Sequence, residues 1–190
     1  MMLRPARTSA PSFFFAPSPP SPPMNANVRQ CRFLITMSQS IFAGLDDSHS
    51  ALEPHRGTKT AGWLIGHLAV TGDFGRRLCG RAPLCPREWR TLFNPGSQPS
   101  ATPTDYPPMA ALCDAFRAVY TDLCDAADAV GPASLTESNP FVPMRTTFPT
   151  AGDFVEYLLS GHLAYHLGQL VAWRGAAGLR PRQGADPMAA

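Results

Sequence analysis

The sequence predicts an all-α protein, a four-helix bundle, from the placement of its prolines and the spacing of its apolar residues. The 21 prolines are concentrated before residue 24 and between Pro83 and Pro108. Because proline interrupts regular helix, the proline-poor stretches elsewhere are free to form helices. Within those stretches apolar residues recur every three or four positions, which is the period of an amphipathic helix. No repeat or strand-rich segment competes with this pattern.

The length and composition fit one domain flanked by tails. A chain of 190 residues with 44% hydrophobic residues can fill a single core. We expect a disordered tail rich in proline and serine over residues 1–24, the bundle over residues 25–180 and a flexible tail over residues 181–190. Proline interrupts the first segment before its apolar part reaches the length of a secretory signal. An organelle transit peptide and a translation start at Met24 or Met37 are the alternatives.

Two helices are expected in the first half of the bundle. The first covers about residues 27–43 and ends at Gly44, a residue type that favours the end of a helix. The second covers about residues 60–79 and is apolar around most of its circumference, so it should lie inside the bundle with His67 pointing into protein. Only one arc of the second helix is expected to face solvent, and it consists of Asp73, Arg76 and Arg77.

A long connection separates the second helix from the third. Residues 80–106 are rich in proline and glycine, which forbid a regular element there, and Trp89 and Phe93 are expected to pin the segment to the bundle. Such a length suits two consecutive helices that run parallel, because the chain must return along the bundle. The third helix is expected over residues 107–130. Its predicted core face comprises Met109, Leu112, Phe116, Val119 and Leu123.

The fourth helix is expected to start at Thr150 and to carry two histidines in the middle of its apolar face. Thr150 and Asp153 have the spacing of a capping box. At about 100° per residue, polar residues such as Arg174 fall on the opposite side. Two imidazoles one turn apart can converge on one ion, about 2.1 Å from each nitrogen. One narrow stripe contains Val155, Leu159, His162, His166, Leu170 and Trp173.

A metal ion explains why the histidines are placed where burial is unfavourable. Each buried imidazole is desolvated, and protonating both would put like charges side by side. His67 on the second helix is expected to supply a third nitrogen. Three protein ligands leave an open position for water or substrate, as in catalytic metal sites. Gln169, near the same stripe, is a candidate to hydrogen-bond a ligand or the bound water.

Each histidine signal also has an ordinary structural explanation. A pair of histidines four residues apart often arises by chance, and a single histidine on an apolar helix is more often a hydrogen-bonded core residue than a ligand. The metal hypothesis therefore depends on the combination, in which three of the five histidines lie on faces predicted to be buried. The other two, His49 and His55, lie in a polar loop and are expected to be solvated.

Composition argues against several classes of partner. A formal charge of +2 and a single lysine, Lys59, provide no cationic stripe for nucleic acid, so we expect a small-molecule partner. The chain has no run of about 18 apolar residues, so no membrane span is expected. The five cysteines are an odd number and form no CxxC pair, so we expect reduced, mostly buried thiols in a cytoplasmic protein.

Three stretches of the sequence resemble proteins of the DinB-like family. They are WLIGHL around His67, WRTLFNPGSQP from Trp89, and HLAYHLGQL from His162. The resemblance covers residues 25–180 and implies an up-down-down-up bundle, with the long crossover between helices 2 and 3 and a three-histidine metal site at one end. It implies relatives that include thiol-dependent S-transferases and a mycothiol-dependent maleylpyruvate isomerase, is compatible with a homodimer, and implies no role in DNA repair. The loop SNPFVPMRTTFP lies outside the match.

Three functional hypotheses follow. The first is a metal-dependent enzyme holding zinc, nickel or iron, which can activate water or a thiol at neutral pH. Transfer or isomerisation with a low-molecular-weight thiol is the first choice and hydrolysis the second, because no carboxylate base is evident near the histidines. Gln169 or Tyr165 is a candidate to orient the substrate. The second hypothesis is a non-catalytic bundle that binds a metal or a ligand. In the third, the histidines are satisfied core residues without a metal.

Overall fold

The computed structural model describes residues 23–130 and 135–179, and their regular secondary structure is helical. Among these residues there is no strand, only an isolated β-bridge between Ser138 and Thr150. The predicted all-α class is therefore confirmed. The long helical stretches are α1 (Pro23–Phe42), α2 (Ala61–Leu78), α4 (Met109–Ala129) and a last stretch of α5 (Ala151–Tyr157), the π-helical turn η5 (Leu158–His162) and α6 (Leu163–Ala176). Shorter turns of helix are η1 (Asp47–His49), α3 (Trp89–Phe93), η2 (Pro103–Asp105) and η4 (Val142–Met144).

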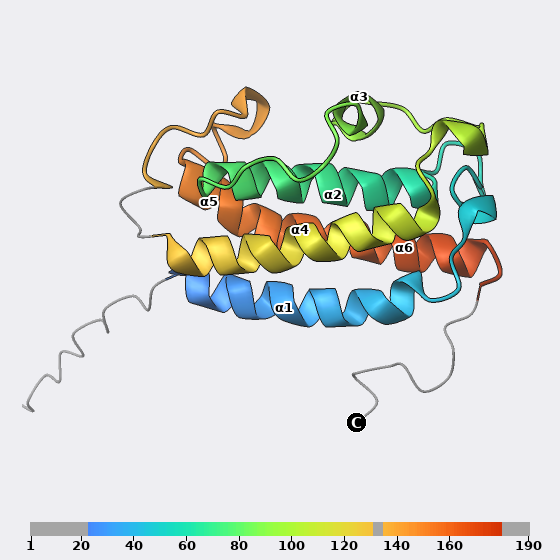
Figure 1. Cartoon of the computed structure of the whole chain (residues 1–190), viewed down its shortest axis with the longest axis horizontal. Helices are drawn as coiled ribbons and strands as arrows, with labels where there is room; N and C mark the ends of the chain where they lie inside the picture. Colours follow the sequence, from blue (N-terminus) through green and yellow to red (C-terminus); the bar gives the residue numbers. More distant parts are fainter. Residues whose placement is uncertain (1–22, 131–134, 180–190) are drawn as a thin grey trace, which may run out of the picture.

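The long helical stretches lie side by side along one axis (Figure 1). Contacts join α1 to α4, α4 to α2, α2 to α6 and α6 back to α1, so the stretches enclose a shared core. In Figure 1, α1 and α6 run in one direction and α2 and α4 in the other. The connection between α2 and α4 returns along the length of the molecule and passes over α2.

The expected tails lie almost entirely outside the described residues. Of the segment 1–24, only residues 23 and 24 are described, and they belong to α1, which therefore begins before the predicted residue 27. The segment 181–190 also lies outside. Within the described part of the chain, no helix combines the length and the apolar character needed to cross a bilayer.

The predicted core face of α4 and the predicted start of the last helical stretch are both confirmed. Thr150 and Asp153 form the expected capping box, in which each side chain accepts a hydrogen bond from the other residue's backbone N–H. All five cysteines are free and four of them are buried, as predicted. The buried residues of α4 include all five that the sequence assigned to the core, Met109, Leu112, Phe116, Val119 and Leu123.

The sequence predicted that the connection from α2 to α4 is irregular throughout. This prediction was wrong, because the connection contains the helix α3. The five residues of α3 include neither proline nor glycine, and they form a short helix whose aromatic side chains are buried. Trp89 is 8% exposed and Phe93 is 0% exposed, which confirms the predicted anchoring. A β-carbon on Gly66 of α2 would lie 2.6 Å from the Phe93 ring. Glycine at this position therefore allows the connection to approach the helix that carries His67.

Two of the three α2 residues predicted to face solvent are buried instead. Asp73 is 3% exposed and Arg76 is 6% exposed, whereas Arg77 is exposed as predicted. Arg76 donates hydrogen bonds of 2.7 Å to Asp73 and to Asp122 of α4, and one of 3.1 Å to the carbonyl of Ala82. Helical spacing identified a polar arc, but it could not show that another helix and the following loop supply charged and polar partners that cover it.

Arg174 of α6 also differs from the predicted solvent-facing position. It is 7% exposed, and its Nη1 atom donates hydrogen bonds to the carbonyls of Ile41 and Ala43, at 2.9 and 3.0 Å. These carbonyls lie at the C-terminal end of α1, where backbone oxygens lack partners within the helix. Arg174 therefore fastens the end of α1 to α6.

Replacing Arg76 by alanine should lower the free energy of unfolding by about 3–5 kcal/mol, because Asp73 would remain buried without its counter-charge. Arg117→Ala is the matched control, since Arg117 and Asp114 have the same spacing but lie on the surface. The control should cost at most about 1 kcal/mol. Urea denaturation of both variants measures the difference, and similar small losses for the two would contradict the buried role.

Candidate metal centre

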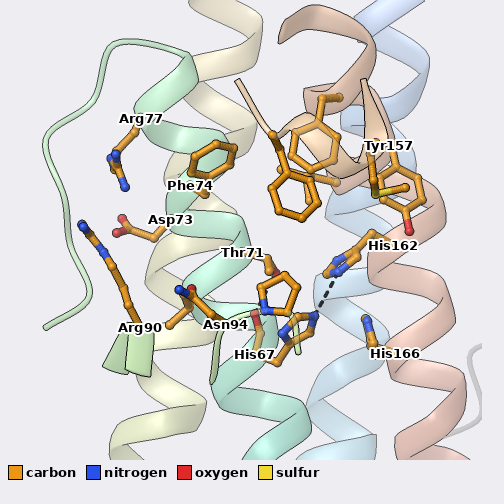
Figure 2. Close-up of a pocket in the computed structure, with 16 residues that line it drawn as sticks. His67, Thr71, Asp73, Phe74, Arg77, Arg90, Asn94, Tyr157, His162 and His166 are labelled. Carbon is orange, nitrogen blue, oxygen red and sulfur yellow. Dashed lines mark hydrogen bonds between the residues drawn. The ribbon is translucent and has the colours of Figure 1, made fainter. Parts of the chain in front are cut away.

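Three histidine side chains from α2, η5 and α6 converge inside the helical array. His67, His162 and His166 each offer one ring nitrogen, and these atoms all lie within 4.8 Å of one another. The Nε2 atoms of His67 and His162 are 3.3 Å apart. Figure 2 shows these two rings turned toward each other, with His166 beside them. The structure thus brings together the three residues that the sequence singled out.

A π-helical turn sets the position of His162. The sequence predicted a regular helix after Thr150, but Leu158–His162 forms the turn η5 between α5 and α6. A π turn holds an extra residue and changes the direction of the side chains that follow it, and such turns are frequent at functional sites. His162 closes this turn, and its ring centroid lies 4.5 Å from that of His166. Apolar spacing did not reveal the turn.

His67 is held by the connection between α2 and α4. Its Nδ1 atom lies 2.7 Å from the backbone carbonyl oxygen of Phe93. Because a carbonyl can only accept, Nδ1 carries the proton and Nε2 keeps a lone pair. Trp63 stacks on the His67 ring, with 4.6 Å between the ring centroids and 8° between the ring planes. The Nζ atom of Lys59 lies over the Trp63 ring, 4.2 Å from its centroid. The orientation of His67 is therefore fixed by both packing and hydrogen bonding.

His166 has a comparable partner in Gln169. The Oε1 atom of Gln169 lies 2.7 Å from Nδ1 of His166, which places the proton on Nδ1 and leaves Nε2 of His166 with a lone pair. Such outer partners orient metal-binding histidines in known sites. Tyr165 is placed differently. Its side chain is 63% exposed, it touches the edge of the His166 ring, and it does not line the cavity described below.

Burial keeps the three imidazoles neutral at neutral pH. Desolvation lowers the pKa of His67 to about 4 and that of His162 to about 2, and repulsion from His166 adds to both shifts. Desolvation also lowers the pKa of His166. A neutral imidazole has the lone pair that a metal ion needs. The site can therefore accept a cation near neutral pH without first releasing protons.

One pair of donor atoms already has the separation that a divalent metal ion requires, and the third nitrogen lies within 4.8 Å of both. Tetrahedral coordination with metal–nitrogen distances of about 2.1 Å puts two ligand nitrogens about 3.4 Å apart. The 3.3 Å between the Nε2 atoms of His67 and His162 agrees with this value. The Nδ1 atom of His162 is buried without a hydrogen-bond partner. Apart from packing, the ring has one polar contact, between its Nε2 atom and Nε2 of His67, and an ion between these two atoms would replace that contact with a stronger one.

The three imidazoles form part of the wall of a cavity of about 510 Å³. This volume lies within the usual range for sites that bind small molecules. Three phenylalanine rings form one part of the wall, where Phe154 of α5 lies 6.0 Å from Phe74 of α2 and 5.6 Å from Phe141, between ring centroids. The apolar part of the lining comprises Val70, Phe74, Pro95, Phe141, Met144, Phe154 and Leu158.

Several residues of the cavity were missed by reasoning from the sequence. Tyr157, Asn94, Arg77 and Arg90 provide polar groups on the wall, and the loop 138–149 contributes two apolar residues. None of the three motifs recognised in the sequence includes that loop, so no motif connected it with the histidines. The only signal in the sequence was that the loop directly precedes the helical stretch of His162 and His166, which could have suggested that it lies near them.

The remaining histidines lie away from this site. His55 is exposed, as predicted. His49 was expected to be solvated, but its side chain is only 16% exposed. Its ring packs against Trp173 of α6, 6.2 Å between centroids, and its Nδ1 atom accepts a hydrogen bond from the backbone N–H of Asp46. The prediction was wrong because His49 completes the capping box of the 3₁₀ turn η1.

The sequence profile of the DinB superfamily matches residues 30–170, a span that contains the three histidines and every residue of the cavity wall. The chain belongs to the DinB superfamily. The resemblance seen in the three sequence motifs is thereby confirmed. Searches of curated proteins and of solved structures found no match. For this DinB-superfamily protein, the chemistry must be argued from its own site.

Acidification should destabilise the metal-free protein. Unfolded histidines bind protons with a pKa near 6.5, whereas burial holds the pKa of His67 at about 4 and that of His162 at about 2. Below pH 6.5 the unfolded state therefore binds more protons, so the free energy of unfolding falls as the pH falls, by up to about 1.4 kcal/mol per pH unit for each histidine. Urea titrations of chelator-treated protein between about pH 7 and pH 5 measure this slope.

The slope should decrease in His162→Ala, which lacks one of the buried groups. It should be unchanged in His55→Ala, because His55 is exposed. A stability that does not vary over this pH range would contradict the buried, neutral state of the three imidazoles.

Proposed function

We propose that this DinB-superfamily protein is a divalent-metal-dependent enzyme that acts on a small molecule, with His67, His162 and His166 as the metal ligands. The observation that carries the proposal is the convergence of three buried or half-buried imidazoles on the wall of a cavity large enough for a substrate. Three protein ligands leave one position of a tetrahedral ion open, as in catalytic rather than structural sites. Zinc, nickel and iron all suit imidazole ligands.

The residues around the histidines support this role. When bound, the ion would lower the pKa of water or of a thiol and so supply a nucleophile at neutral pH. The carbonyl of Phe93 and the side-chain oxygen of Gln169 each accept the Nδ1 proton of a histidine, which holds the ring and leaves Nε2 available. The aromatic wall beside them provides an apolar surface that keeps water away from a bound substrate.

Within this class, we infer transfer or isomerisation that uses a low-molecular-weight thiol, with hydrolysis as the second choice. Activation of water is commonly assisted by a general base. Among the described residues, the only acidic side chain on the cavity wall is Asp73, and it already accepts hydrogen bonds from Arg76 and from the backbone N–H of Leu84. A thiol loses its proton far more readily than water, so it has less need of such a base.

We infer further properties from the family resemblance. The helix directions in Figure 1 support an up-down-down-up four-helix bundle. Free, mostly buried cysteines suit the cytoplasm. The cavity supports a small-molecule partner rather than nucleic acid. Exposed apolar residues on α6 favour a homodimer, since Tyr165 is 63% and Val171 is 50% exposed.

The alternative is a non-catalytic bundle that binds a metal or a ligand. The observation that favours it is the deep burial of two of the three histidines, since His67 is 4% and His162 is 7% exposed. A closed environment of this kind suits a structural ion as well as a reactive one. The two proposals differ in what happens when the ion is removed.

His162→Ala and His166→Ala should each lose most of the bound metal, because each substitution removes one of three ligands. Elemental analysis of protein purified without a histidine tag or chelator measures the metal content, and circular dichroism checks that the helices survive. His55→Ala is the matched control, since His55 is exposed and lies outside the cluster. A wild-type protein with less than about 0.1 metal ion per chain would contradict the proposal.

Chelation should abolish a thiol-dependent reaction and leave the helices intact, because the apolar core does not depend on the ion. The assay would follow transfer of glutathione or cysteine to small electrophiles before and after chelation, with activity restored by the added metal. Loss of the helical signal on chelation would support the structural alternative. Thiol transfer that continues at the same rate in chelated protein would refute the catalytic role of the ion.

A further inference from the structure

Two arginines on the cavity wall lack carboxylate partners. Arg77 of α2 and Arg90 of α3 both line the cavity. Figure 2 shows their side chains on the same side of α2, near the Asp73 carboxylate, and the three histidines on the opposite side of the view. Within the described residues, no Asp or Glu side chain forms an ion pair with either arginine, whereas their neighbours Arg76 and Arg81 are paired.

The charges near these arginines do not cancel. Asp73 is paired with Arg76 at 2.7 Å, and Asp122 is paired with Arg76 at 2.7 Å and with Arg81 at 3.7 Å. These two carboxylates and two guanidinium groups balance one another. Among these six side chains, the charges of Arg77 and Arg90 are therefore the two that no carboxylate balances.

The surrounding structure holds both arginines at the cavity. Arg77 is exposed, and its guanidinium carbon lies 5.6 Å from the centroid of the Phe74 ring, a cation–π contact that favours a position beside the cavity. Arg90 is half-buried and lies in α3, whose first and last residues, Trp89 and Phe93, are buried in the bundle. The wall of the same cavity includes Phe74 and Phe154, whose ring centroids lie 6.0 Å apart.

We propose that Arg77 and Arg90 form an anion-binding pair that selects substrates with a carboxylate group on an apolar body. The body would pack against the aromatic wall, and the end opposite the carboxylate would face the three histidines. This orientation relies on the proposed function, whereas the anion-binding pair itself does not. Planar guanidinium groups bind carboxylates through paired hydrogen bonds. A single negative charge suits an apolar cavity better than a phosphate dianion, because each buried charge must be desolvated.

Binding of hydrocinnamate to the metal-loaded protein tests the proposal, with hydrocinnamamide as an uncharged probe of the same shape. In calorimetry at low salt, the carboxylate should bind at least about tenfold more tightly than the amide. Arg77→Gln and Arg90→Gln should each remove most of this preference and change binding of the amide by less than about twofold. Arg87→Gln is the matched control and should keep the preference, because Arg87 is exposed on the same connection and does not line the cavity.

Two results would overturn the proposal. One is equal binding of the acid and the amide, or no binding of either at about millimolar concentration. The other is a preference for the acid that survives both arginine substitutions and disappears in His162→Ala, which would place the carboxylate at the metal. Metal content measured on the same samples separates this test from that of the proposed function. Metal-free protein that still prefers the acid through both arginines would support the anion pair and refute the metal-dependent enzyme.

Discussion

The buried hydrogen bond between His67 and the carbonyl of Phe93 is the interaction on which the site depends. It is 2.7 Å long and joins α2 to the connection that follows it. It puts the His67 proton on Nδ1, so that the opposite nitrogen faces His162 with a lone pair. The close approach requires glycine at position 66, where a β-carbon would meet the Phe93 ring. The same contact brings Arg90 and Asn94 to the cavity wall.

Burial gives the three histidines their chemical character. Exposed imidazoles would be partly protonated near neutral pH and would repel one another and any cation. Desolvation lowers the pKa of each ring, so all three remain neutral donors. This state is costly for the folded protein without an ion, because Nδ1 of His162 is buried without a hydrogen-bond partner. Packing of the apolar core holds the donor nitrogens together, and a bound ion would stabilise the folded state and offset part of the desolvation cost.

The sequence predicted the histidine cluster because helical periodicity shows which side of a helix is buried, and the profile match agrees with the motifs around His67 and His162. It did not predict the π-helical turn before His162, the burial of Arg76 or the short helix α3. The burial of Arg76 depends on a contact between segments distant in the sequence, its ion pair with Asp122, and the π-helical turn leaves no mark on the apolar spacing. The cavity wall from the loop 138–149 was missed because no recognised motif includes that loop. Periodicity therefore identified the metal-site candidates but not the surface that would meet a substrate.

X-ray absorption spectroscopy of the metal-loaded protein tests the central claim most directly, because it reports the atoms bound to the ion. We predict three imidazole nitrogens at about 2.0–2.1 Å for zinc, together with one oxygen ligand from water that sulfur replaces when a thiol is added. His166→Ala should lower the number of imidazoles by one. A spectrum with sulfur ligands in the absence of added thiol, or with one imidazole or none, would contradict a site built from His67, His162 and His166.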